Sequence, residues 1–181
     1  MSASAEPQVR KLTIRDYYLL AREGHLDPSE RTELVDGQII SMFPIGFSHS
    51  DVQAKLLTQL YRQQDLQRFR IWPGGLRISD TGERYPDISV VRPGLSNQPS
   101  ANDLFLLVEI ADTSLTYDLT EKKKEYGEAG VPEYWVVDVT DKTIFVFQTE
   151  HGCYTSLGAK STGILQLRAF PEVTITIADL F

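Results

Sequence analysis

One stretch of the chain, residues 104–111, is apolar except for a single glutamate, Glu109. The run reads Leu-Phe-Leu-Leu-Val-Glu-Ile-Ala, which is long enough for a strand buried on both faces. A buried carboxylate without a partner costs several kcal/mol. Glu109 is therefore expected to bind a metal ion, to form an ion pair, or to be held protonated.

A second acidic residue, Asp87, opens another apolar run, Tyr-Pro-Asp-Ile-Ser-Val-Val. On its own, Asp87 is better explained as the first residue of a strand that follows Pro86. Beside Glu109 it has a second explanation, because two carboxylates on neighbouring strands can share one cation.

The length and composition favour one globular unit. A chain of 181 residues with 41% hydrophobic content can bury one sizeable core, so we expect a single domain over residues 1–181, with a core at about 11–148 and a C-terminal β extension at 149–181. The apolar runs are far shorter than the ~20 residues of a membrane span, so no membrane partner is expected. Cys153 is the single cysteine, which fits a reducing cytoplasm.

Three segments carry apolar residues at helical spacing. We expect these helices near residues 13–24, 48–64 and 118–129. Ser48 or Ser50 is the expected cap of the second helix, and Asp118 with Glu121 forms a capping-box pattern at the start of the third. Gly130 and Pro132 mark its end.

The other periodic segments indicate strands. Asp36-Gly37 lies between two β-prone runs and predicts a hairpin over residues 32–42. Residues 69–72, 76–79 and 88–91 are interpreted as a meander with tight turns. The run 133–139 is reached from the Glu109 strand through a helix, which predicts that these two strands are parallel. Further antiparallel strands are expected at 143–148 and 152–177.

The predicted strand places Glu109 on one face with Leu107 and Ala111. Ala111 leaves room beside the carboxylate. In the helix that follows, the spacing lets either Lys122 or Lys123 reach back toward that space.

This grouping suits metal-assisted hydrolysis of a phosphodiester. Mg²⁺ prefers oxygen ligands and keeps several waters, so two carboxylates, a backbone carbonyl and a substrate phosphate suffice. Asp87 and Glu109 would be the ligands, Ile110 would supply the carbonyl, and Lys122 would stabilise negative charge.

Several motifs together point to a known family. They are Glu33-Leu-Val-Asp-Gly37, His49, Pro86-Asp87-Ile-Ser-Val-Val91, Val108-Glu109-Ile-Ala, Asp118-x-x-x-Lys122-x-x-x-Tyr126 and Gly130-Val-Pro-Glu-Tyr-Trp-Val-Val-Asp138. On these motifs the chain resembles the Uma-two family of restriction-endonuclease-like proteins, within the PD-(D/E)XK nuclease superfamily, over roughly residues 11–148.

The resemblance implies an α/β fold with a restriction-endonuclease-like core, in which helices flank a central mixed β-sheet and additional antiparallel strands follow. It implies a Mg²⁺- or Mn²⁺-dependent endonuclease that acts on DNA. Asp87, Glu109, Lys122 and Glu33 would be the catalytic residues, and Asp87, Glu109 and Ile110 would hold the metal.

One position departs from the superfamily pattern. Ala111 stands where most members place a lysine, and Lys122 occupies the position from which the Uma-two family supplies it. If neither Lys122 nor Lys123 points inward, the catalytic interpretation fails. The rival is a catalytically inactive oligomeric module that binds or regulates, which the net charge of −7 also favours. Hydrolysis of a smaller phosphate ester is a further rival.

Other residues have structural explanations beside the functional ones. Glu33 could complete the site as an outer ligand, but it could also face solvent or pair across the strands. His49 could touch the site, or it could cap or pack a helix. Tyr126 could donate a hydrogen bond into the site, or it could belong to the core. The basic residues at 62–84 and 122–124 fit a solvated surface as well as a nucleic-acid groove. If both strands of DNA are cut symmetrically, a homodimer is expected.

Overall fold

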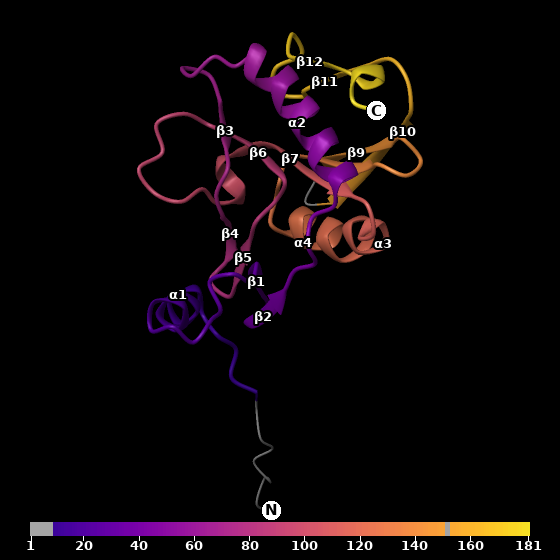
Figure 1. Ribbon diagram of the computed structural model, residues 1–181. Coiled ribbons are helices and arrows are strands. Elements are labelled where there is room, and N and C mark those ends of the chain that lie inside the picture. The colour runs from indigo at the N-terminus through magenta and orange to yellow at the C-terminus, as the bar shows by residue number, and fades with distance from the viewer. Residues whose placement is uncertain (1–8, 151–152) are drawn as a thin grey trace, which may run out of the picture.

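The computed structural model describes residues 9–150 and 153–181, and a six-stranded mixed sheet forms its centre (Figure 1). The remaining residues of the expected 1–181 unit, 1–8 and 151–152, lie outside the described part. The strand order is β10-β9-β8-β7-β6-β3. The bounds are Arg70–Trp72 for β3, Ile88–Val91 for β6, Leu104–Ala111 for β7, Glu133–Asp138 for β8, Thr143–Glu150 for β9 and Cys153–Lys160 for β10.

The two strands predicted to be parallel, β7 and β8, are parallel neighbours, and the other pairs of this sheet are antiparallel. This confirms the central mixed sheet. The C-terminal strands are also antiparallel: β10 pairs with β9, and β11 (Ile164–Gln166) pairs with β12 (Thr174–Thr176).

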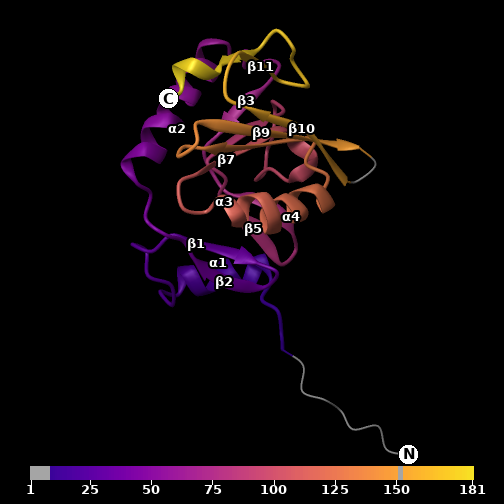
Figure 2. The same cartoon turned by 90° about the vertical axis from the view of Figure 1, so that its right-hand side faces the viewer.

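Helices cover both faces of the six-stranded sheet (Figure 2). Helix α2 (Phe47–Arg62) packs on the face that carries Val108 and Ile110. The opposite face carries Leu107 and Ala111, and the helical segment after β7 packs there. That segment consists of α3 (Leu115–Tyr117), a π-helical turn η2 (Asp118–Lys122) and α4 (Lys123–Glu128).

A second sheet lies beside the first with the order β2-β1-β5-β4. Its strands are β1 (Thr32–Val35), β2 (Gln38–Ser41), β4 (Leu76–Ser79) and β5 (Gly82–Arg84), and α1 (Ile14–Arg22) lies against it (Figure 1). The β1–β2 hairpin is the predicted one, with Asp36 and Gly37 both at positive φ. A methyl group on Gly37 would lie 2.5 Å from Lys11 Cβ, so this turn also needs glycine for space.

Three local predictions were wrong. Residues 82–84 form β5, and β4 and β5 join the second sheet, so the expected meander is divided between two sheets. Gly46, rather than Ser48 or Ser50, is the N-cap of α2. Asp118 lies inside the helical segment, which begins at Leu115, so Asp118 is not its cap.

Among the helices of the described part, none is long and apolar enough to cross a bilayer.

The end of α4 follows the prediction, because Gly130 adopts a φ of 83° just after it.

Candidate active site

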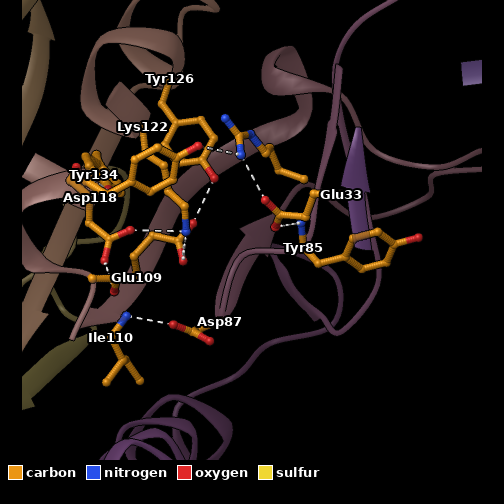
Figure 3. Close-up of polar contacts among 12 residues, drawn as sticks. Glu33, Tyr85, Asp87, Glu109, Ile110, Asp118, Lys122, Tyr126 and Tyr134 are labelled. Atoms are coloured by element: carbon orange, nitrogen blue, oxygen red, sulfur yellow. Dashed lines mark hydrogen bonds and ion pairs between the residues drawn. The ribbon is translucent and has the colours of Figure 1, made fainter. Parts of the chain in front are cut away.

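The pairing of β6 with β7 brings Asp87 beside the Glu109 strand. Ile88 faces Val108 in this antiparallel register, so Asp87, one residue before β6, comes opposite Glu109, and its carboxylate reaches the next residue of β7, Ile110. Its Oδ2 accepts a hydrogen bond of 2.7 Å from the Ile110 N–H (Figure 3). Asp87 and Glu109 both line one cavity of about 200 Å³.

Asp87 is fixed from two further directions. His49 Nε2, from the first turn of α2, lies 3.0 Å from Asp87 Oδ2. The Gln53 side chain donates a hydrogen bond of 2.8 Å to the backbone carbonyl of Asp87. Of the two explanations for His49, the structure therefore favours contact with the site over a purely capping or packing role. His49 Nδ1 is buried and has no hydrogen-bond partner among the described residues.

Glu109 is almost fully buried and has a partner for each oxygen (Figure 3). Its Oε1 accepts a hydrogen bond of 2.8 Å from the Tyr126 hydroxyl. Its Oε2 lies 3.1 Å from Lys122 Nζ, which is also 3.1 Å from Asp118 Oδ1. Asp118 Oδ2 in turn accepts a hydrogen bond from the Ser114 hydroxyl.

The structure distinguishes the two lysines that the helical spacing left open. Lys122 is 4% exposed and points toward Glu109, whereas Lys123 Nζ lies 4.5 Å from the centre of the Phe147 ring. The π-helical turn, which widens the helix at 118–122, places Asp118 and Lys122 together on the sheet-facing side. The spacing in the sequence identifies the helix face that turns toward Glu109, but it does not decide whether Lys122 or Lys123 reaches this carboxylate.

This cluster places the carboxylates of Glu109 and Asp118 around the ammonium group of Lys122. Burial and this excess of negative charge determine the pKa values of Glu109 and Lys122. Burial raises the pKa of Glu109 to about 8, although the charge of Lys122 opposes the rise. Burial lowers the pKa of Lys122, but the charges of Glu109 and Asp118 outweigh it and raise that pKa above its usual value. Protonation of Glu109 is therefore favoured relative to an exposed carboxyl, while Lys122 keeps its proton.

The raised pKa of Glu109 determines how metal binding depends on pH. A metal ligand must be ionised, so a cation at Glu109 displaces a proton. Affinity for a divalent cation at this carboxylate should rise as the pH rises through about 8.

Glu33 is buried, so it does not face solvent, and it pairs across the strands with a residue of β5, as one of its structural explanations predicted. Its Oε2 accepts a 2.9 Å ion-paired hydrogen bond from Arg84, on β5, and its Oε1 accepts one of 2.9 Å from the Tyr85 N–H. The same guanidinium binds Glu125. Glu33 lines a second cavity together with Asp87, rather than the cavity of Glu109.

Burial corrects the interpretation as a solvated surface or a groove for two of the basic residues, whereas Arg68 and Arg77 are about half exposed and agree with a solvated surface. Arg84 and Lys122 are internal partners of carboxylates. Arg68 and Arg77 are paired with Glu172 and Asp80.

The oxygen donors of the cavity fit a hard divalent cation. No cluster of three or more His, Cys, Asp or Glu side chains suited to a metal occurs in residues 9–150 and 153–181. A site here must rely on Asp87, Glu109 and a backbone carbonyl. Ile110 meets that need, because the N–H and C=O of a strand residue face the same neighbour and its N–H points to Asp87. Mg²⁺ and Mn²⁺ accept such a set with waters.

The mixed sheet, its flanking helices and the acidic cavity define a nuclease-like α/β protein. The chain belongs to the Uma2 family, described as "Putative restriction endonuclease", which matches residues 14–178. The predicted family is thus confirmed, and the match extends further toward the C-terminus than the expected 11–148.

A solved structure has the same fold. It is described as "a putative nuclease belonging to DUF820 from Anabaena variabilis", with a TM-score of 0.72 and 19% sequence identity over 94% of this chain and 97% of that one. No curated protein matches the chain.

Proposed function

We propose that this protein is a divalent-metal-dependent endonuclease that hydrolyses DNA phosphodiester bonds. The observation that carries the proposal is the convergence of Asp87, Glu109 and Lys122 on one cavity. The membership of the Uma2 family supports a nuclease-like role.

The metal would be held by the carboxylates of Asp87 and Glu109 and by the carbonyl of Ile110. When bound, Mg²⁺ or Mn²⁺ lowers the pKa of a water molecule and offsets charge on the phosphate. The hydrogen bond from the Ile110 N–H and the nearby His49 ring hold the Asp87 carboxylate in place.

Lys122 acts as a fixed positive charge in this proposal. Its pKa is raised by two carboxylates, so the ammonium does not serve as a proton acceptor. An ammonium group has three N–H donors, and Glu109 and Asp118 occupy two of them. The third is free to bind the phosphate or the attacking water, and Tyr126 fixes the Glu109 carboxylate from the opposite side.

Two other functions compete with this one. An inactive binding module is favoured by the pairing of Lys122 with two carboxylates and by the net charge of −7. Hydrolysis of a smaller phosphate ester is favoured by the size of the cavity, about 200 Å³.

A plasmid-nicking assay separates these functions. The wild-type protein should nick supercoiled DNA with Mg²⁺ or Mn²⁺, and excess chelator should stop the reaction because the two carboxylates alone cannot activate water. Addition of Mn²⁺ beyond the chelator should restore it. Nicking that persists in chelator would contradict metal dependence, and no nicking with any divalent metal would favour the inactive module. Activity on nucleotides without activity on DNA would favour the smaller ester.

The homodimer, the cytoplasmic location and the single domain over residues 1–181 stay predictions. Glu33 stays a predicted catalytic residue, and its pairing with Arg84 gives it a structural role as well.

A further inference from the structure

A second cavity, of about 460 Å³, continues from the proposed active site. The two cavities share five lining residues: Arg31, Met42, Ile45, Tyr85 and Asp87. Asp87 therefore lies where they meet. A molecule whose phosphate lies beside Lys122 in the first cavity has room to extend into the second.

Aromatic rings line much of this second cavity. Tyr61 comes from α2 and is 51% exposed, Trp72 ends β3, and Tyr85 precedes Asp87 by two residues. The partly buried Trp72 ring is held by a hydrogen bond of 3.1 Å from its Nε1 to the Gly75 carbonyl. Aromatic rings in such positions stack on nucleobases without regard to sequence.

Polar side chains also line this cavity. Gln53 lines it, and its Nε2 is engaged by the Asp87 carbonyl, which leaves its Oε1 as an acceptor for a base. Arg31 is exposed at the junction of the two cavities and forms no ion pair with another residue of the described ranges. Its guanidinium is placed to bind a phosphate of the same strand.

This inference rests on the proposed function. We propose that the cavity lined by Tyr61, Trp72 and Tyr85 binds the base of an unpaired nucleotide beside the scissile phosphate. The substrate is then single-stranded DNA. The size of the cavity agrees, because it lies in the range of small-molecule pockets and accommodates one nucleotide rather than a duplex. A base inside a duplex reaches such a pocket only after it leaves the stack. Cutting an unpaired strand needs one active site, so the inference does not depend on a dimer.

The two tryptophans of the chain provide a binding signal that is independent of catalysis. Trp135 is fully buried, whereas Trp72 lines the cavity. A short single-stranded DNA, titrated in chelator so that no cleavage occurs, should quench the Trp72 fluorescence. The same strand in duplex form should quench far less, and so should an abasic strand of equal length.

Variants at Tyr61 test the stacking directly. Tyr61→Ala should weaken binding of the single strand about tenfold, because one stacked base is lost, whereas Tyr61→Phe should bind as the wild type. Tyr61 lies at the surface, so the change opens no core cavity. Leu66→Ala is the matched control, because Leu66 is 61% exposed and lines neither cavity.

The outcomes separate this inference from the proposed function. Equal quenching by duplex or abasic DNA would overturn the base pocket. A deoxynucleoside monophosphate that binds as tightly as the strand would overturn single-stranded DNA as its ligand. Selective quenching by a protein that cleaves neither plasmid nor single-stranded DNA with any divalent metal would support the pocket and reject the nuclease. Nicking with unchanged behaviour of Tyr61→Ala would reject the pocket and support the nuclease.

Discussion

Replacing Asp87 with asparagine should reduce DNA nicking about a thousandfold, an effect of the size seen when an essential electrostatic group is removed from an active site. The side chain keeps its shape and can still accept the hydrogen bond from the Ile110 N–H. It loses the charge that would hold the metal. Nicking rates of the variant and the wild type, measured over a range of Mn²⁺ concentrations, provide the comparison.

Asp51→Asn is the control for this change. Asp51 lies on the exposed side of α2, where it pairs with Lys55, so the same change of charge leaves the cavity intact. Its nicking rate should equal that of the wild type. An Asp87→Asn protein that nicks as fast as Asp51→Asn would show that Asp87 holds no metal.

Replacing Arg84 with methionine should destabilise the protein by about 3–5 kcal/mol, because it leaves a buried carboxylate without its charge partner. Arg84 is 1% exposed and binds Glu33 at 2.9 Å, and Glu33 is itself 1% exposed. For a chain of this size, that loss lowers the midpoint of thermal unfolding by about 10 °C. Thermal unfolding followed by circular dichroism at neutral pH measures it.

A double variant tests the stated cause. Glu33→Met combined with Arg84→Met removes both charges, and apolar side chains in place of a buried ion pair are often tolerated. The double variant should recover much of the lost stability. A single Arg84→Met variant as stable as the wild type would contradict the role of this ion pair.

The sequence was sufficient for the parts of the site that depend on strand periodicity. The apolar runs around Asp87 and Glu109 predicted two neighbouring strands, and β6 and β7 are adjacent. The Gly130 and Pro132 signals predicted the end of the intervening helix, and the parallel pairing of β7 with β8 followed from it.

The sequence was insufficient where side chains distant in the chain meet. The contact of His49 with Asp87 depends on how α2 crosses the sheet, and the Arg84 pair with Glu33 depends on β5, which was interpreted as a turn. Asp118 carries a helix-cap pattern, but it serves as a partner of Lys122 because the helix begins earlier and widens into a π turn. Local sequence patterns do not determine these contacts, because the contacts depend on tertiary packing.

The central claim is that Asp87 and Glu109 together hold one divalent cation, and a crystal soaked in Mn²⁺ tests it most directly. The soak is made at alkaline pH, because the raised pKa of Glu109 opposes metal binding at lower pH. The anomalous signal of manganese should give a peak between the two carboxylates and within coordination distance of the Ile110 carbonyl. A map with no peak there, while Lys122 stays bound to Glu109, would contradict the account.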